Sequence, residues 1–268
     1  MKVFQPFERV IWGVGSLLSI LLVLLLGGPL VALLASVDIE SVTDAAQHPL
    51  FWPAVWLSFK TSAFSLVLII VTGTPLAWWL SRSQSGVQRC VSVIVDLPIV
   101  VPPAVVGLAL LVLLGRRGLV GVHLDTFDLQ LAFTSRAVIL AQVVVAAPFY
   151  VRTATGVFRM VCEDTLLVAK TLGARPLDIL TKVVLPSTRT GLSAGASLAW
   201  ARALGEFGAT LIFAGSLPSE TQTMPLAILT ALELDVRLAV VFALALTILS
   251  ILSLLTIRRL ASGQEVSI

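Results

Sequence analysis

The stretch VIWGVGSLLSILLVLLLGGPLVALLAS, residues 10–36, contains no charged residue. A helix rises about 1.5 Å per residue, so about 20 apolar residues cross the roughly 30 Å of hydrocarbon in a bilayer. Lys2 and Arg9 precede the stretch, as basic residues precede the apolar core of a signal peptide. A cleavable signal peptide, however, has an apolar core of only about 7–15 residues. We therefore predict an uncleaved membrane anchor.

The composition of the whole chain also indicates a membrane protein. Of its 268 residues, 57% are hydrophobic and 12% are charged, and the mean hydropathy is +1.02. A soluble domain carries about 25% charged residues. The pI of 9.2 and the formal charge of +3 would also suit a nucleic-acid-binding protein. The basic residues lie at the ends of apolar runs and form no contiguous patch, so we expect no nucleic-acid partner.

Six apolar segments are long enough to cross a bilayer: residues 10–36, 54–80, 93–114, 136–157, 190–214 and 236–257. They predict an all-α integral membrane protein with six transmembrane helices, embedded in the lipid bilayer. We expect one transmembrane domain over residues 1–268, with a long loop over residues 158–189.

The basic residues also predict the orientation of the chain. With both termini inside, 12 of the 18 Lys and Arg residues flank the cytoplasmic ends of the segments, and five flank the outer ends. Cytoplasmic loops carry an excess of Lys and Arg, so this bias favours an N-in, C-in topology. The first outer loop, residues 37–53, has three acidic residues and no basic one.

A polar island interrupts the apolar sequence at EDTLLVAKTLGARPLDILTKVVLP, residues 163–186. Asp164 or Thr165 is suited to cap a short helix, and Gly173 to follow its end in a left-handed conformation. Pro176 is suited to the first turn of a second helix, which Pro186 would end. One face of the first helix is apolar, with Leu166, Leu167, Ala169 and Leu172. The island is therefore either a knob that contacts a protein or a helix pair lying on lipid headgroups.

The island resembles the EAA loop of prokaryotic ABC-importer permeases, which reads Glu-Ala-Ala, three residues, Gly, nine residues and Ile-x-Leu-Pro. Glu163 matches the signature Glu if the spacing to Gly is relaxed, and a tighter alignment uses Ala169 and Gly173. Nine residues separate Gly173 from the closing Val183-Val184-Leu185-Pro186, as in the signature. The chain departs from the signature at Asp164, Thr165 and Val183.

Two further segments extend the resemblance. DLPIVVPPAVVGLALL, residues 96–111, is similar to the third-span motif of molybdate, tungstate and sulfate permeases. ARALGEFGATLIFAGSLPSETQTMPLAI, residues 201–228, is similar to the LGEFGAT and TQT-x-PLAI blocks of molybdate and tungstate permeases. The resemblance implies the permease subunit of an ABC importer for a tetrahedral oxyanion, molybdate or tungstate, with sulfate or thiosulfate as the alternative.

The resemblance also implies partners and a location. These are a second permease copy, two ABC ATPase subunits and an extracytoplasmic oxyanion-binding protein, in the inner membrane of a prokaryote. ATP and Mg would bind to the ATPase, since the chain has no G-x-x-x-x-G-K-[ST] loop, and we expect it to hold no cofactor or metal and to be no enzyme. The implied ATPase contact comprises Glu163, Asp164, Ala169, Gly173, Ala174, Pro176 and Pro186.

Three ionisable residues, Asp96, Arg202 and Glu206, fall within predicted spans, where a charge costs at least about 2.5–3.5 kcal/mol. Arg202 and Glu206 are four residues apart and would share one helix face. They form either a self-neutralising pair that fixes packing or a position on the pathway between two permease copies, and the two roles are compatible. Asp96 is expected to cap the third helix.

Prolines and glycines mark the same region. Pro102 and Pro103 produce either a packed kink or a break that faces a water-filled cavity. Gly205 and Gly208 flank Glu206 and permit close helix approach, as a dimer seam would also require. The predicted pathway or dimer-interface residues are therefore Pro102, Pro103, Arg202, Gly205, Glu206 and Gly208.

The segment 215–235 contains a shorter apolar run. Thr223 and Pro225 suit the start of a helix too short to span, either a lid at the outer mouth or a helix lying at the interface. An ion-coupled secondary transporter is the alternative function class, but three intramembrane charges are few for an ion site, and no inverted repeat is evident.

Overall fold

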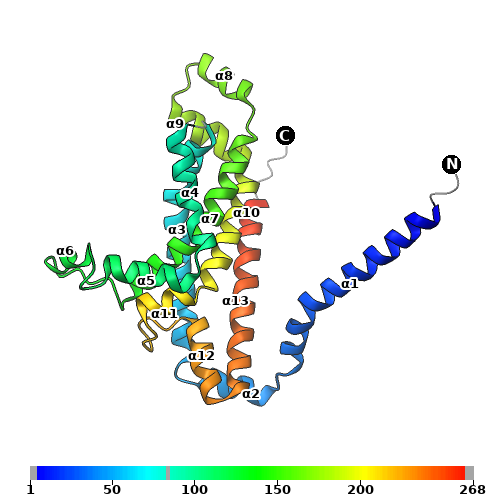
Figure 1. The fold of residues 1–268 in the computed structure, drawn as a ribbon, viewed down its shortest axis with the longest axis vertical. Helices are drawn as coiled ribbons and strands as arrows, with labels where there is room; N and C mark the ends of the chain where they lie inside the picture. The colour runs from blue at the N-terminus through cyan, green and yellow to red at the C-terminus, as the bar shows by residue number, and fades with distance from the viewer. Residues whose placement is uncertain (1–4, 83–84, 263–268) are drawn as a thin grey trace.

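The structure is a computed structural model that describes residues 5–82 and 85–262, and every regular element in those ranges is helical (Figure 1). The elements are α1 (Gln5–Ala35), α2 (Ile39–Gln47), α3 (Phe51–Arg82), α4 (Gly86–Val100), α5 (Pro103–Leu114), α6 (Gly121–Asp125), α7 (Ser135–Arg159), α8 (Glu163–Thr171), α9 (Pro176–Asp178), the π-helix η1 (Ile179–Val184), α10 (Leu185–Leu204), α11 (Gly208–Ala214), α12 (Met224–Leu234) and α13 (Val236–Ser262).

Helices α3, α7 and α10 form the centre of the bundle, and polar side chains join them inside an apolar core. The Ser65 hydroxyl donates to Oε1 of Gln142 on α7 at 3.0 Å. The Trp200 indole N–H on α10 donates to the Ser62 hydroxyl, also at 3.0 Å. Because these buried polar groups bond from one helix to another, they fix how the three helices are rotated against one another.

Four of the six predicted spans are confirmed as helices long and apolar enough to cross a membrane. They are Gly15–Ala35, Phe51–Arg82, Ser135–Arg159 and Val236–Ile257. The structure of the remaining two segments differs from one straight helix each, so the six-span topology stays a prediction.

The predicted third span, 93–114, is broken. Helices α4 and α5 meet at a bend of 116°, so α4 runs along the bundle while α5 runs across it (Figure 1). The break follows from the two prolines. Pro102 and Pro103 have no N–H to continue the α4 hydrogen bonds, and Pro103 instead occupies the first turn of α5. Counted together, the bent pair makes a fifth candidate span.

The predicted fifth span, 190–214, is also broken. Helix α10 ends at Leu204, and α11 begins only at Gly208. Apolar composition predicts how long a helix can be, but glycine on both sides of Glu206 and Phe207 lowers helix propensity enough for the chain to turn there.

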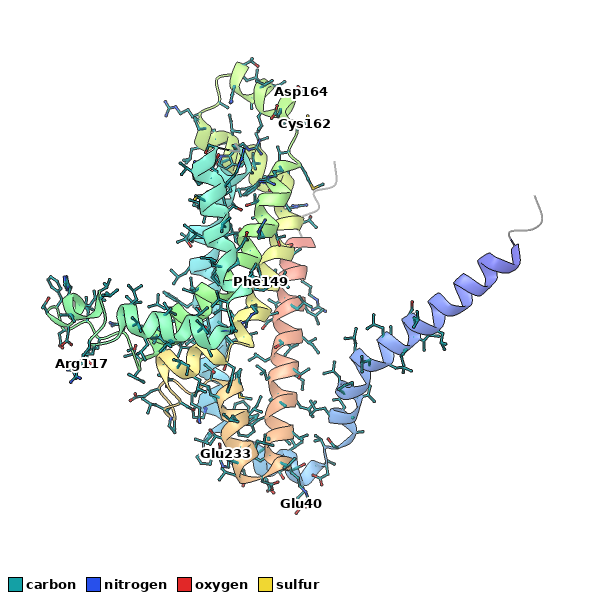
Figure 2. The ribbon with its side chains drawn as sticks, viewed as in Figure 1. Glu40, Arg117, Phe149, Cys162, Asp164 and Glu233 are labelled. Carbon is teal, nitrogen blue, oxygen red and sulfur yellow. The ribbon has the colours of Figure 1, made fainter. Side chains whose placement is uncertain are left out.

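The two ends of the bundle carry different elements. Helices α8 and α9 lie at one end, and α2 and α12 lie at the other (Figure 1). In Figure 2, Cys162 and Asp164 mark the first end, and Glu40 and Glu233 mark the second. Helix α12 begins after Thr223 with Pro225 in its first turn, as predicted, although the Thr223 side chain makes no capping hydrogen bond. One face of α12 is buried against the bundle, where the Met224 N–H donates to the buried Ser58 hydroxyl of α3 at 2.7 Å, and its other face, with Leu232 and Leu234, is exposed.

Helix α1 stands apart from the bundle (Figure 1). The apolar side chains of its second half are exposed, with Leu25 and Leu26 at 69% and 67%. Such a helix needs lipid or another protein around it, because large apolar patches in water are unfavourable.

Candidate functional site

The loop predicted over residues 158–189 forms the end of the molecule that contains α8 and α9. Helix α8 begins at Glu163, with Cys162 at the N-cap position, so the predicted cap at Asp164 or Thr165 is wrong by one or two positions. Glu163 and Asp164 instead occupy the first turn. There their carboxylates interact favourably with the positive end of the helix dipole, which explains why the helix extends over them.

The end of α8 is the left-handed glycine turn that the sequence predicts. Gly173 has φ +81°. The Gly173 N–H donates to the Lys170 carbonyl at 2.9 Å, and the Ala174 N–H donates to the Ala169 carbonyl at 3.0 Å. These two bonds are a Schellman motif, which satisfies the last carbonyls of the helix. No atom lies within 4 Å of where a Gly173 Cβ would be, so the backbone angle and not crowding requires glycine here.

Beyond the turn, the chain forms one continuous helical stretch from Pro176 to Leu204. Pro176 starts α9 as predicted, but Pro186 does not end the helix. The stretch passes through the π-helix η1, and Pro186 lies in the first turn of α10 directly after it. A proline in a regular α-helix clashes with the carbonyl four residues earlier. The wider π turn before Pro186 relieves that clash, which explains why the helix continues.

The residues of the predicted apolar face of α8 do not share one environment. Leu166 is buried in the core with Ile179. Leu167 and Leu172 are exposed, Leu172 by 82%, and Leu177 at the start of the next helix is exposed by 74%. This end of the chain is therefore packed through Leu166, with Ala169 and Ala174 against the same cluster, and presents other leucines outward, as surfaces that contact another protein or a membrane do.

A cleft of about 700 Å³ separates the knob from the end of α3. Arg82 lines this cleft and connects α3 to α7. Its guanidinium donates to the Phe158 carbonyl and stacks 4.1 Å from the centre of the Trp78 ring. Trp78 in turn contacts the Phe158 ring edge-on at 5.5 Å. Sequence analysis missed this connection, although a Trp and an Arg four residues apart at the end of a span are a recognisable cation–π pair. The cleft is lined by Trp78, Arg82, Glu163, Leu166, Leu167, Lys170, Ala174, Pro176 and Ile179.

An exposed ion pair lies on the second half of the knob. The Lys182 ammonium is 2.6 Å from the Asp178 carboxylate, one helical turn away. The hydrogen bond from Lys182 lowers the pKa of the Asp178 carboxyl below its usual value. Both side chains are in solvent, so we attribute little stability to the pair.

The two helix breaks lie against each other. A Cβ on Gly107 of α5 would lie 2.6 Å from the Ala209 carbonyl oxygen of α11, and one on Gly208 would lie 3.2 Å from the Ala104 backbone nitrogen. Backbone therefore packs on backbone at this crossing, as the prediction for Gly208 requires. Gly205 has no comparably close neighbour, since its nearest atom is in its own helix at 3.6 Å. Sequence analysis missed Gly107, although it lies within the quoted third-span motif.

Arg202 and Glu206 form the predicted pair, but not along one helix. Arg202 is in the last turn of α10, whereas Glu206 lies in the break after it. An Arg202 guanidinium nitrogen is 2.8 Å from Oε2 of Glu206, and Oε1 accepts the Ala209 N–H, also at 2.8 Å. The contact to Oε2 is an ion pair without hydrogen-bond alignment. Glu206 is only 1% exposed, so its charge is compensated by the arginine and by the first turn of α11.

Asp96 is inside α4 and does not cap it, contrary to the prediction. The cap is Ser85, whose hydroxyl and Gln88 form a capping box. The Asp96 carboxylate instead binds the Arg152 guanidinium of α7 through two hydrogen bonds. A partner 56 positions away explains how a carboxylate is tolerated in an apolar segment.

The chain is similar to known transport permeases. The chain is 41% identical over 227 residues to the "Molybdenum transport system permease protein ModB" of Mycobacterium tuberculosis, covering 85% of this chain and 86% of that protein. It is 38% identical to the protein of the same name from Escherichia coli strain K12, covering 68% and 80%.

The fold is similar to that of a bacterial alginate ABC transporter, solved in complex with an alginate pentasaccharide-bound periplasmic protein, with a TM-score of 0.72. The two chains are 16% identical, and the match covers 98% of this chain and 96% of the other. The family described as "Binding-protein-dependent transport system inner membrane component" matches residues 69–263, which is well over half of the chain. The chain therefore belongs to the family of inner membrane components of binding-protein-dependent transport systems.

Proposed function

We propose that this chain is the membrane subunit of an ATP-driven importer for molybdate or tungstate. The observation that carries the proposal is the 41% identity to a molybdenum transport permease over 85% of this chain and 86% of the relative. An alignment that covers 85% of the chain includes the α8–α9 end, both helix breaks and the core between them.

The distribution of charge supports an orientation with the α8 end in the cytoplasm. Arg82, Arg89, Arg152, Arg159, Lys170, Arg175, Lys182 and Arg189 lie in or beside the helix ends at that side. The opposite end, with α2 and α12, carries the acidic residues Asp38, Glu40, Asp44, Glu233 and Asp235, together with the basic residue Arg237. Basic residues concentrate on the cytoplasmic side of membrane proteins, so this arrangement supports N-in, C-in with six membrane crossings, two of them made by broken helices.

We propose that the knob formed by α8 and α9 docks on a separate ATPase subunit, which binds the ATP and Mg. The exposed leucines of the knob, with the 700 Å³ cleft beside them, supply an apolar contact surface. In this assignment Glu163, Asp164 and Pro176 belong to the docking surface, whereas Ala169, Gly173 and Ala174 maintain its shape through the Schellman motif. Pro186 belongs to the connection into the membrane and not to the surface.

The continuous helix from Pro176 to Leu204 supports a direct mechanical link. At about 1.5 Å per residue it extends roughly 40 Å, from the knob to the last turn before the break at Glu206. A rigid-body movement of the knob would therefore displace Arg202 and Glu206 against α5, where Pro102, Pro103 and Gly208 meet. We propose that this crossing is part of the gate of the pathway, with the buried ion pair as a neutral hinge point.

The remaining partners follow from the same reading. We propose that two copies of the chain enclose the pathway, and that the exposed α1 packs on the second copy or on lipid. An extracytoplasmic binding protein would deliver the oxyanion at the α2–α12 end. The alginate transporter of similar fold was solved with its periplasmic protein bound, which makes such delivery a reasonable expectation here.

A test of this assembly is co-purification of the chain with an ABC ATPase encoded beside it, followed by ATP hydrolysis in nanodiscs. Binding protein loaded with molybdate or tungstate should stimulate hydrolysis severalfold over the unloaded protein. Stimulation by sulfate-loaded protein alone would move the cargo to sulfate, and failure of any ATPase to co-purify would contradict the docking assignment.

A further inference from the structure

A groove separate from the cleft beside the knob lies where α3 passes the start of α7. Its volume is about 820 Å³, within the range of about 300–1,000 Å³ that ligand pockets occupy. Most of its wall is apolar, and the larger apolar side chains in it are Trp56, Leu57, Phe59, Phe64, Val67 and Ile139. It shares no residue with the cleft beside the knob or with the crossing of the two broken helices.

Two basic side chains line the groove, one from each helix. Lys60 is on α3, and Arg136 is in the first turn of α7. Both are exposed, and within the described part of the chain neither forms an ion pair. The neighbouring acidic residue is Glu220, whose backbone carbonyl accepts the Ser135 hydroxyl at 2.7 Å. The Glu220 carboxylate makes no ion pair among the described residues, and one carboxylate would in any case leave one of the two positive charges uncompensated.

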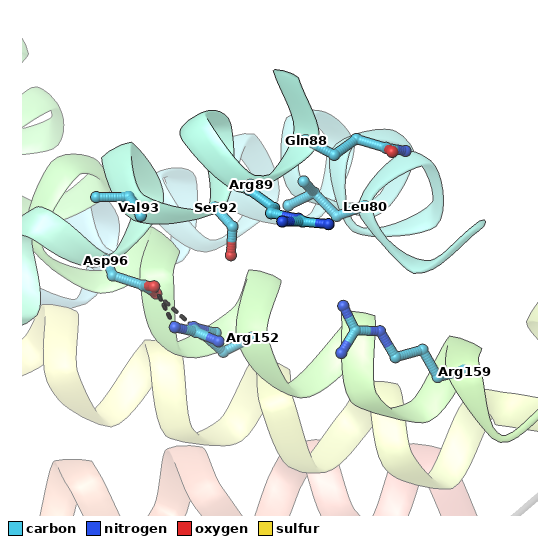
Figure 3. Close-up of a pocket in the computed structure, with 8 residues that line it drawn as sticks. All are labelled: Leu80, Gln88, Arg89, Ser92, Val93, Asp96, Arg152 and Arg159. Atoms are coloured by element: carbon cyan, nitrogen blue, oxygen red, sulfur yellow. Dashed lines mark hydrogen bonds and ion pairs between the residues drawn. The ribbon is translucent and has the colours of Figure 1, made fainter. Parts of the chain in front are cut away.

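A basic side chain farther along α7 shows the contrast. Arg152 is paired with the Asp96 carboxylate of α4 (Figure 3). The hydroxyls in the groove wall are engaged as well, since Thr61 donates to the Leu57 carbonyl at 2.8 Å and Ser135 is bonded as described above. The groove therefore presents two uncompensated cations beside an apolar wall. A ligand that matches it is anionic at one end and apolar over the rest.

The position of the cations along α3 matches the edge of a bilayer. Lys60 and Arg82 are 22 positions apart on α3 with no charged residue between them, so they lie about 33 Å apart along the helix axis. The hydrocarbon core of a bilayer is about 30 Å thick. When Arg82 lies at one membrane surface, Lys60 therefore lies at the other, with Val67 in the hydrocarbon. Trp56 and Trp52 are exposed one and two turns farther out, as in the aromatic belt at a membrane–water interface.

We propose that this groove binds an anionic glycerophospholipid, of which phosphatidylglycerol is an example. The lipid phosphate lies between the Lys60 ammonium and the Arg136 guanidinium, where charge-assisted hydrogen bonds to phosphate are strong. An acyl chain lies along Phe64, Val67 and Ile139, which follow the two cations toward the membrane interior. The positive end of the α7 dipole adds to the attraction, since the N-cap residue of α7 supplies no side-chain hydrogen bond.

Two other occupants fit the groove less well. A free inorganic oxyanion would use the two cations but would leave Phe64 and Val67 exposed, by 54% and 56%. A second copy of the chain would have to bring a carboxylate to the depth of Lys60. The carboxylates that lie within predicted spans, Asp96 and Glu206, are already paired with arginines. Only the side of the membrane, the outer leaflet, depends on the proposed orientation, whereas the site itself does not.

The first test measures lipid binding to the full purified permease by native mass spectrometry. Phosphatidylglycerol and phosphatidylcholine with the same acyl chains are titrated into the protein in mild detergent. Lys60→Gln, Arg136→Gln and the double variant remove the charges, whereas Lys60→Arg keeps one in place. The matched control is Arg117→Gln, which removes an exposed arginine from the loop after α5, outside the groove (Figure 2).

We expect the wild type to bind phosphatidylglycerol about 25-fold more tightly than phosphatidylcholine, because each basic residue near an anionic lipid contributes about fivefold. Each single glutamine variant should keep a preference of about fivefold, and the double variant should have none. Lys60→Arg and Arg117→Gln should retain the wild-type preference. Equal binding of the two lipids by the wild type would overturn the proposal, as would a preference that the double variant retains.

The second test identifies the occupant in a membrane with a photoreactive side chain, Val67→p-benzoylphenylalanine, in nanodiscs of phosphatidylcholine and phosphatidylglycerol. We expect lipid adducts in which phosphatidylglycerol exceeds its share of the nanodisc, and no such excess in the Lys60→Gln, Arg136→Gln background. A crosslinked permease dimer as the main product would show that a second copy covers the groove and would overturn the proposal. Lipid adducts in the proportions of the nanodisc would also overturn it. Neither test involves transport, the ATPase or the cargo, so the outcome is independent of the proposed function.

Discussion

Gly107→Ala adds one methyl group at the crossing of the two broken helices. The new Cβ would lie 2.6, 2.8 and 3.1 Å from the carbonyl oxygen, the Cα and the carbonyl carbon of Ala209. All three are backbone atoms, so no side-chain rotation relieves the contact. Restoring an ordinary separation of 3.4 Å from the oxygen requires a movement of about 0.8 Å between α5 and α11. Overpacking of this kind costs about 1–3 kcal/mol.

The matched control is Gly156→Ala, where no atom lies within 4 Å of the new Cβ. Both glycines are inside helices, so each substitution gains about 0.5–1 kcal/mol of helix propensity. The difference between the two variants therefore isolates the overpacking, and we expect Gly107→Ala to be less stable than Gly156→Ala by about 1–3 kcal/mol.

Unfolding of the purified permease in mixed micelles of mild and denaturing detergent, followed by tryptophan fluorescence, measures this difference. The proposed gate adds a second expectation, since Gly107→Ala should lose transport activity and Gly156→Ala should retain it. Equal stability of the two variants would refute the backbone-to-backbone crossing. A stability difference without a transport difference would instead limit the crossing to a structural role.

Three further predictions concern the knob, the buried pair and the anion affinity. Gly173→Val forces a β-branched residue to φ +81° and should abolish ATPase co-purification with normal membrane insertion, whereas Gly173→Asn should retain it in part; wild-type association of the valine variant argues against the docking assignment. Arg202→Met should reduce stability by about 3–5 kcal/mol, because the Glu206 carboxylate remains buried alone; Glu206→Gln leaves a partly exposed guanidinium and should cost less, and the double variant should be less affected than Arg202→Met. A double variant that is stable but inactive in transport would assign the pair to the pathway, and equal damage from all three would contradict a self-neutralising pair. Calorimetry on the isolated permease should show no oxyanion binding tighter than about millimolar, near −4 kcal/mol, because the Arg202 guanidinium within the predicted span is already paired with Glu206; a micromolar constant is incompatible with this expectation.

Local chemistry made parts of this structure predictable. The Gly173 turn, the start of α9 at Pro176 and the start of α12 after Thr223 each depend on a few adjacent residues, and all three are confirmed. Four spans were predictable because apolar length alone specifies them. The pairing of Arg202 with Glu206 was predictable because two opposite charges only four residues apart can meet even though α10 ends between them.

Other features depend on distant parts of the chain or on local geometry that no residue pattern indicates. Asp96 was predicted to be a cap because the sequence alone does not show that its partner, Arg152, lies opposite it on another helix. Pro186 was predicted to end the helix because proline normally does so. The helix continues through it because of the preceding π turn, which no residue pattern indicated. Pro102 and Pro103 indicated that the third predicted span is kinked or broken, but the bend of 116° depends on how α5 packs against Ala209.

The central claim is that this chain moves an oxyanion across the membrane with energy supplied by a separate ATPase. It is tested most directly by reconstituting the chain with its ATPase and binding protein in liposomes and measuring uptake of radiolabelled molybdate and tungstate. The account predicts uptake that requires ATP on the ATPase side, is inhibited by the other of the two oxyanions, and is lost with Gly173→Val. Uptake that proceeds without ATP and follows an imposed ion gradient would contradict it.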